Sequence, residues 1–139
     1  FDQTAMSEAG ASGLMQLMPA TAARVAKMIG ISGKSYTTDP QTNIALGVRY
    51  FDHLYSEYNS LPMSIAAYNA GPGNVNKWVK RYGDPRHAKS HYEVIDWIES
   101  IPFNETRNYV KSVLENFTVY DSIISQNHAP KKIISFLEN

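Results

Sequence analysis

Apolar residues recur at every third or fourth position along almost the whole of this sequence, and no stretch shows the strong alternation of a half-buried strand. Because an α-helix has about 3.6 residues per turn, this spacing gathers apolar residues on one side of each helix and predicts an all-α fold. Proline suits the first turn of a helix and glycine the residue after its last turn, so they divide the pattern into separate helices. We expect helices from Pro19 to Gly30, from Asp39-Pro40 to Tyr58, from Pro62 to Gly71, over 75–82 and 94–98, and from Asn104 to Ile124.

Each predicted helix has an apolar face that we expect to be buried. The second helix carries Ile44, Val48, Phe51, Tyr55 and Tyr58, and the last long helix carries Tyr109, Val113, Phe117, Tyr120 and Ile124. Shorter faces consist of Val25, Met28 and Ile29, then Val75, Trp78, Val79 and Tyr82, and then Val94, Ile95 and Ile98. Asn104 is a favourable N-cap, and an acid at Glu105 suits the positive end of the helix dipole.

The remaining segments are predicted to be irregular or short. A loop is expected to carry His87, Lys89 and His91, and the tail after Pro130 has the pattern of one more short amphipathic turn or helix. The length of 139 residues fits one domain of ordinary size. The chain begins on Phe1 without a methionine, so we expect a fragment or a processed product.

The charge balance and the absence of cysteine exclude several kinds of site. Lys+Arg and Asp+Glu number 13 each, whereas a protein that binds nucleic acid or an anionic membrane surface usually has a basic excess. We therefore expect no nucleic-acid partner. Without cysteine there is no disulfide, thiolate zinc site or cysteine nucleophile. No apolar run is long enough for a transmembrane segment. His87 and His91 have metal-ligand spacing but no evident third ligand, so we predict no metal and no cofactor.

Three segments contain side chains suited to chemistry, and each also has a purely structural interpretation. Glycines at 10 and 13 precede Met15, Gln16 and Met18, which suit a sugar-lined wall or, equally, a turn that leads into a core helix. Tyr68 and Asn69 lie at a predicted helix end, where Asn69 can bind a ligand or cap the last carbonyls. These two segments remain open on the residues alone.

The third segment contains two carboxylates, Glu99 and Glu105. A carboxylate pair suggests glycoside hydrolysis, but Glu105 is better explained as an acid in the first turn of a helix. Glu99 ends the preceding helix, where a negative charge gains nothing from the helix dipole. We therefore expect Glu99 to be functional and Glu105 to be structural.

Four ordered blocks resemble the soluble lytic murein transglycosylase family. Residues 11–22 are similar to its Gly-Leu-Met-Gln signature, and Asp39-Pro40 with Asn43-Ile44, Gly47 and Tyr50 is similar to the next block. Residues 66–73, continued by Val75 and Trp78, resemble the Ala-Tyr-Asn-Ala-Gly motif. Residues 99–109 with Val113-Leu114 and Tyr120 resemble the last motif. The resemblance implies a transglycosylase domain over 1–120 and a C-terminal helical tail over 121–139.

The family resemblance implies a goose-lysozyme-like helical domain that cleaves the β-1,4 bond between N-acetylmuramic acid and N-acetylglucosamine. It implies a 1,6-anhydromuramoyl product, peptidoglycan glycan strands or muropeptides as partners, and a location in a bacterial periplasm or cell envelope. The family's catalytic Glu would lie three residues before Phe1, so no residue of this chain takes that role and most of the first catalytic helix would be lacking. Glu8 falls at a variable position in the glycine-rich turn, where we expect it to be solvated.

The same resemblance assigns roles to seven residues of this chain. Ser7 and Tyr120 match residues that support the catalytic carboxylate. Gln16, Met18, Tyr68, Asn69 and Glu99 match residues that bind the saccharide. Two alternatives remain: a goose-type lysozyme that uses water, and a muropeptide-binding module without catalysis.

Overall fold

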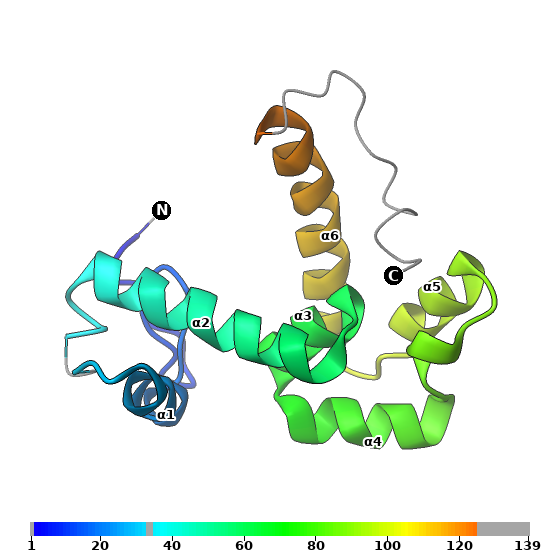
Figure 1. Cartoon of the computed structure of the whole chain (residues 1–139), viewed down its shortest axis with the longest axis horizontal. Helices are drawn as coiled ribbons and strands as arrows, with labels where there is room; N and C mark the ends of the chain where they lie inside the picture. Colours follow the sequence, from blue (N-terminus) through cyan, green and yellow to red (C-terminus); the bar gives the residue numbers. More distant parts are fainter. Residues whose placement is uncertain (1, 33–34, 125–139) are drawn as a thin grey trace. The chain divides into compact units, whose positions relative to one another are not determined.

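A computed structural model describes residues 2–32 and 35–124 of the chain (Figure 1). These residues form six α-helices and one 3₁₀ turn, and they contain no strand beyond two isolated bridges, so the predicted all-α fold is confirmed. The elements are α1 (Pro19–Ile29), α2 (Pro40–Tyr58), α3 (Leu61–Ala70), α4 (Pro72–Tyr82), η1 (Pro85–His87), α5 (His91–Glu99) and α6 (Asn104–Ile124).

The helix boundaries follow local chemistry at most of the predicted positions. Asp39 accepts hydrogen bonds from the backbone N–H groups of Gln41 and Thr42 and so caps α2, and the Thr42 bonds lower the pKa of its carboxyl. Asn59 follows α2 with φ of 46°, the left-handed conformation that asparagine tolerates after a helix.

Two boundary predictions were wrong by one to three residues. His91 begins α5 rather than lying in the preceding loop, because the Ser90 hydroxyl accepts from the Glu93 N–H and caps that helix. Asn104 is the first residue of α6 rather than its N-cap, and its Oδ1 accepts from Arg107 Nη2 at 2.5 Å.

The chain divides into two compact units, Phe1–His53 and Leu54–Asn139, so that α2 begins in the first and ends in the second. Helix α6 runs from Asn104 to Ile124, the range predicted for the last long helix. Residues 125–139, including the predicted amphipathic segment after Pro130, lie outside the described residues.

The buried face of α2 differs from the predicted one. Ile44, Val48 and Tyr55 are exposed and Phe51 is half-buried, so of the predicted residues Tyr58 alone is buried. The buried positions are Asn43, Leu46, Gly47, Tyr50, Leu54 and Tyr58. Both stripes are helical in period, and the structure selects the one in which Asn43 and Gly47 meet the glycine-rich loop.

The predicted face of α6 was wrong by one position. Tyr109, Phe117, Tyr120 and Ile124 are exposed and Val113 is half-buried, whereas Thr106, Val110, Leu114 and Thr118 are buried. Met28, Tyr82 and Ile95 on shorter helices are also exposed, and Trp97 takes the buried place on α5. The apolar residues of α6 cover a wide part of its surface. Packing against α3 buries the side of α6 that carries Thr106.

A buried amide organises the loop of the first unit that precedes α1. Asn43 is 1% exposed; its Oδ1 accepts from the Met15 N–H, and its Nδ2 donates to the carbonyls of Ser12 and Tyr36. A Cβ at Gly13 would lie 2.2 Å from Asn43 Nδ2, and a Cβ at Gly47 would lie 2.6 Å from Met15. Asn43 thus replaces regular backbone pairing in the loop, and these two glycines allow the close approach.

The core of the second unit is built around α3. Every residue from Pro62 to Ala67 is buried, and α3 packs against both α4 and α6, whose first half lies beside α3 (Figure 1). Phe103, immediately before α6, meets Trp78 of α4 edge-on at 5.3 Å between ring centroids. The helix that carries Tyr68 and Asn69 is therefore fixed on several sides.

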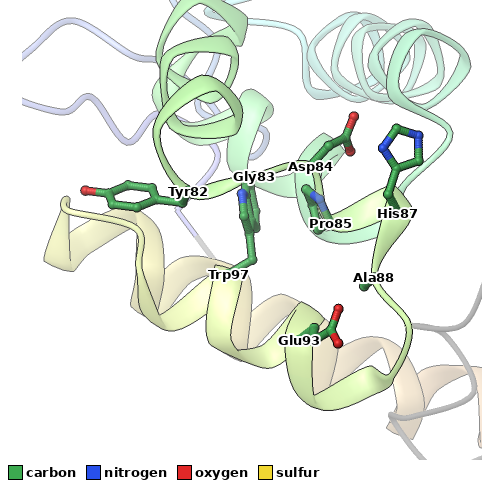
Figure 2. A pocket seen from close by; sticks show the side chains of 8 residues that line it. All are labelled: Tyr82, Gly83, Asp84, Pro85, His87, Ala88, Glu93 and Trp97. Atoms are coloured by element: carbon green, nitrogen blue, oxygen red, sulfur yellow. The ribbon is translucent and has the colours of Figure 1, made fainter.

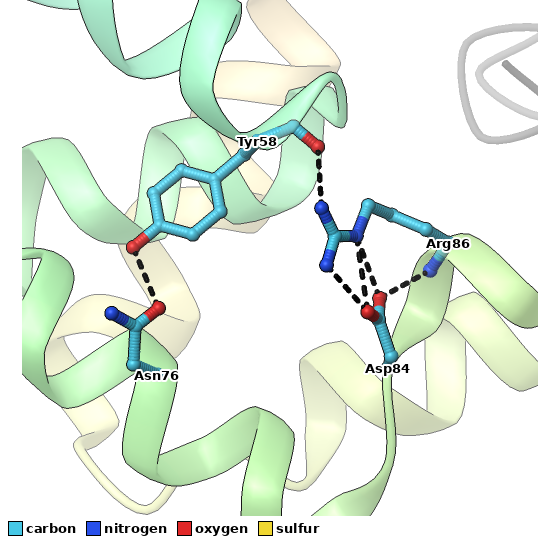
Figure 3. A network of polar contacts seen from close by, with 4 residues as sticks. All are labelled: Tyr58, Asn76, Asp84 and Arg86. Atoms are coloured by element: carbon cyan, nitrogen blue, oxygen red, sulfur yellow. Dashed lines mark hydrogen bonds and ion pairs between the residues drawn. The ribbon is translucent and has the colours of Figure 1, made fainter.

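A polar network joins α2, α4 and η1 within the second unit (Figure 3). The Tyr58 hydroxyl lies 3.1 Å from Asn76 Oδ1, and the Tyr58 carbonyl accepts from Arg86 Nη1 at 3.5 Å. The Arg86 guanidinium also donates to Asp84, with Nη2 at 2.6 Å from Oδ2. These hydrogen bonds to Arg86 lower the pKa of the Asp84 carboxyl.

Substitution of the two loop glycines tests the Asn43 contact. Gly10 and Gly13 have φ of 88° and 76°, but a Cβ at Gly10 would meet nothing within 4 Å. Gly10→Ala is expected to lower the free energy of unfolding by about 1–2 kcal/mol, the cost of the left-handed conformation. Gly13→Ala should lose about 2–5 kcal/mol because overpacking adds about 1–3 kcal/mol. Urea denaturation measures both, and equal losses would contradict the contact.

The Asp84–Arg86 pair is expected to stabilise the protein only above acidic pH. A lowered folded-state pKa makes the carboxylate's contribution complete above its unfolded value of about 3.9, and it is lost as pH falls through the folded-state pKa. Asp84→Asn should therefore cost about 0.5–1 kcal/mol at pH 7, and the wild-type and variant stabilities should converge below about pH 4. Urea denaturation midpoints of both proteins, measured from pH 7 to below about pH 4, give this stability difference.

Asp52→Asn is the control for that experiment. Asp52 pairs with Arg49 at 2.6 Å on the surface of α2, with both side chains more than half exposed, so its loss should change stability little at pH 7. A difference between Asp84→Asn and wild type that stays constant with pH would contradict the assignment.

Candidate functional site

The first unit holds three of the predicted site residues in or beside the loop that precedes α1. Ser7 is half-buried, and its Oγ accepts from the Ala11 N–H at 3.0 Å, so the hydroxyl shapes the turn. Gln16 lies in the loop and Met18 immediately precedes α1, and both are exposed. Glu8 is exposed in the turn, as expected.

The Gln16 amide is held by the loop itself. Its backbone has φ of 48°, and its Nε2 donates to the carbonyls of Gly13 at 2.8 Å and Ala5 at 3.2 Å. Because the amide nitrogen is used within the loop, Oε1 is the remaining polar atom of the side chain, and it is an acceptor. The structural and the functional interpretations of this segment are therefore compatible.

The second unit holds Tyr68 and Asn69 at the C-terminal end of α3. Tyr68 is half-buried and Asn69 is exposed. Thr106 Oγ1 lies 2.6 Å from Asn69 Oδ1. Two of the last carbonyls of α3 are bonded by other groups, since Asn74 Nδ2 donates to the Ala70 carbonyl and the Gly71 N–H donates to the Ala67 carbonyl.

Glu99 lies at the last position of α5 and is paired with two cations of α6. Its Oε1 is 3.0 Å from Lys111 Nζ, its Oε2 is 3.9 Å from Arg107 Nε, and the side chain is 52% exposed. Arg107 also donates to the Ile101 carbonyl at 2.9 Å. These cations give Glu99 a structural partner, so its place at a helix end no longer argues by itself for a sugar contact.

The start of α6 thus contacts Asn69 through Thr106 and Glu99 through Arg107 and Lys111. Tyr120 lies farther along the same helix, about 21 Å from Thr106 along the axis at about 1.5 Å per residue. Its side chain is 59% exposed. Within the second unit, the structure therefore places Asn69 and Glu99 at one end of α6 and Tyr120 toward the other.

Several residues that hold the site were not predicted. Asn43 in the first unit and Thr106 in the second are polar residues at buried helix positions, and Arg107 and Lys111 lie about one helical turn apart on α6. A polar side chain in a buried register is a recognisable signal, but it identifies a partner only when the packing is known.

A pocket of about 380 Å³, open to solvent, lies between the end of α4, η1 and α5 (Figure 2). Asp84, His87 and Glu93 line it, but Asp84 pairs with Arg86, and Glu93 accepts from the Lys89 N–H at 3.0 Å beside the cap of α5. Trp97 also lines the pocket, and its buried Nε1 has no hydrogen-bond partner among the described residues. None of the predicted site residues lines this pocket.

Two kinds of feature are absent from the part of the chain that the structure describes. No group of three or more His, Asp or Glu side chains there is arranged to hold a metal ion. No helix in this part of the chain combines the length and the apolar character needed to cross a membrane.

Comparison with known proteins shows which family this chain resembles. The sequence matches the Transglycosylase SLT domain family over residues 1–91 and the Soluble lytic transglycosylase helical domain family over residues 100–128. It is 45% identical over 112 residues to the soluble lytic murein transglycosylase of Escherichia coli (strain K12), which covers 78% of this chain and 16% of that protein. It is 39% identical over 127 residues to its counterpart in Salmonella typhimurium, which covers 88% of this chain and 19% of that protein.

The fold is also similar to a solved structure. An inactive mutant of lytic transglycosylase Slt from Pseudomonas aeruginosa matches with a TM-score of 0.79 and 37% identity, over 100% of this chain and 22% of that one. The chain spans about a fifth of the length of these relatives. Since one family matches 91 of its 139 residues and these relatives are 37–45% identical, the chain belongs to the soluble lytic murein transglycosylase family.

Proposed function

We propose that the protein is a lytic transglycosylase that cleaves the β-1,4 bond between N-acetylmuramic acid and N-acetylglucosamine and leaves a 1,6-anhydromuramoyl end. The observation that carries the proposal is the pair of polar side chains held at the start of α6. Asn69 is bonded by Thr106, and Glu99 is held by Lys111 and Arg107. A fixed amide and a fixed carboxylate suit the amide and hydroxyl groups of a glycan strand.

The acid/base is proposed to be a Glu three residues before Phe1. A catalytic general acid needs a raised pKa, which burial in apolar surroundings provides. Among residues 2–32 and 35–124 no carboxylate is buried, and Glu99 lies beside two cations. The described carboxylates are therefore poorly suited to that role.

The proposed reaction uses one carboxyl group twice. The acid first protonates the glycosidic oxygen as the bond to the muramoyl C1 breaks. The resulting carboxylate then takes the proton of the muramoyl 6-hydroxyl while that oxygen attacks C1. The proton is returned to the carboxylate, and no water is consumed. No cofactor is needed.

The other predicted residues keep supporting roles in the proposal. Gln16, Met18 and Tyr68 bind the saccharide together with Asn69 and Glu99. Ser7 and Tyr120 support the catalytic carboxylate. For Ser7 this role is compatible with its bond to the Ala11 N–H, since an Oγ that accepts there still has its hydrogen to donate.

The proposed substrate places the protein in the bacterial cell envelope, on the periplasmic side, where peptidoglycan lies. The relatives named above are called soluble lytic murein transglycosylases, which supports murein as the substrate. We propose glycan strands or muropeptides as partners and no role for nucleic acid.

The product of a digest tests the reaction. The full-length protein should release muropeptides that are lighter by one water than those released by a hydrolase, because the muramic acid ends carry an internal 1,6-ether. Mass spectrometry of digested sacculi measures this. Reducing muramic acid ends would instead identify a lysozyme, and binding without release would identify a muropeptide-binding module. The 139-residue chain alone is expected to release nothing, because a general acid–base contributes about 10²–10⁴-fold and serves both steps.

Substitution of the two carboxylates tests the place of Glu99. In the full-length enzyme Glu99→Gln should lower the rate on glycan while the melting temperature changes little, because exposed ion pairs contribute about 0–1 kcal/mol. Glu105→Gln should leave the rate near normal and lose about 0.3–1 kcal/mol of stability from the helix dipole. Lys111→Met is the matched control, since it removes the shorter of the two ion pairs of Glu99 but keeps the carboxylate. If Lys111→Met lowers the rate as much as Glu99→Gln, the ion pair is what matters and Glu99 has no separate sugar contact.

A further inference from the structure

A buried hydroxyl fixes the orientation of the Asn69 side-chain amide. Thr106 is 2% exposed on the first turn of α6, and its Oγ1 lies 2.6 Å from Asn69 Oδ1, 37 positions away in sequence. An amide oxygen can only accept a hydrogen bond, so the Thr106 hydroxyl is the donor. This bond directs Oδ1 toward α6 and leaves Nδ2 as the polar atom of the amide that an outside partner can reach.

Two features make this orientation stable. A threonine in a helix commonly donates to the carbonyl three or four residues before it, whereas Thr106 donates across to α3. Its branched Cβ restricts the χ1 rotamer, and the surrounding burial removes water as a competing partner. Asn69 itself is exposed, so without Thr106 its amide would be free to rotate and to present either its oxygen or its hydrogens.

A fixed donor discriminates between the groups of a sugar. A hydroxyl both donates and accepts, so it can bind an amide in either orientation. The carbonyl oxygen of an acetamido group only accepts, so it requires the hydrogens of Nδ2. Orientation of Asn69 by a buried hydroxyl therefore matters most for an acetamido carbonyl.

We propose that Thr106 is a positioning residue that turns the Nδ2 hydrogens of Asn69 toward the substrate, so that Asn69 recognises the carbonyl oxygen of an N-acetyl group on the glycan. The proposal rests on the proposed function and deepens it, because it assigns a chemical group of the substrate to one side chain. Thr106 acts through Asn69 and does not touch the sugar.

The test compares two glycans that differ in the acetyl group. The full-length protein is used with its proposed acid/base Glu replaced by Gln, so that binding is measured without turnover. Calorimetry gives the dissociation constants for a murein tetrasaccharide and for the same tetrasaccharide after chemical de-N-acetylation. The parent should prefer the acetylated glycan. Thr106→Val, which keeps the shape but removes the hydroxyl, should weaken its binding by about 5–10-fold, the range of one ordinary hydrogen bond, and should reduce the preference.

Two matched variants separate positioning from a structural role. Thr106→Ser keeps the hydroxyl and should restore binding to within about twofold of the parent, because the same bond can form. In the Asn69→Ala background, Thr106→Val should have no further effect on affinity, since its action passes through the amide it orients.

Other outcomes would contradict either the proposed function or the positioning role of Thr106. If the parent binds neither glycan, the proposed function fails, and this inference fails with it. If the parent binds and Thr106→Val keeps the full preference for the acetylated glycan, the positioning role is wrong. If Thr106→Val weakens both glycans equally, or still acts in the Asn69→Ala background, the hydroxyl only supports the fold.

Discussion

Burial of α3 on all sides is the constraint on which the second unit depends. From Pro62 to Ala67 the helix has no exposed residue, so it is stable only while other elements cover it. Helices α4 and α6 provide much of that cover, and the one hydroxyl in the run, on Ser64, donates to the Ser60 carbonyl at 2.7 Å. Because α3 is covered in this way, Tyr68 and Asn69 leave the core at a defined place beside α6.

Helix α6 combines packing with the placement of polar groups. Its buried side carries Val110 and Leu114, and the turn before them carries Thr106 and Arg107. The same helix therefore covers α3, orients the Asn69 amide and pairs with Glu99. Since these interactions share one rigid element, a shift of α6 would disturb both polar side chains together, and neither can be tuned alone by repacking this helix.

The first unit uses a related device in its loop. There Asn43 is the buried amide, and it bonds three backbone groups of segments that form no strand and are otherwise joined by isolated bridges such as Ser12 with Leu17. An amide offers donors and an acceptor on one short side chain, so it can replace a strand or a cap where the backbone must turn. A buried backbone group left without a hydrogen bond would cost about 1–3 kcal/mol. The absence of a Cβ at Gly13 lets the Asn43 amide come close enough to form these bonds.

The helices and their order follow from local sequence, because proline, glycine and capping residues act within a few positions of the chain. Local sequence also determined the family motifs and most of the candidate residues, since these are runs of particular side chains. The buried faces of α2 and α6, in contrast, depend on packing between elements that are distant in sequence. Both helices have two apolar stripes, such as Val48 beside Leu46 and Tyr109 beside Val110, and periodicity does not choose between them. The choice depends on a partner distant in sequence. Thr106 is buried because Asn69, 37 positions away, accepts its hydrogen. Asn43 is buried because its two amide hydrogens are accepted by the carbonyls of Ser12, 31 positions away, and Tyr36, 7 positions away.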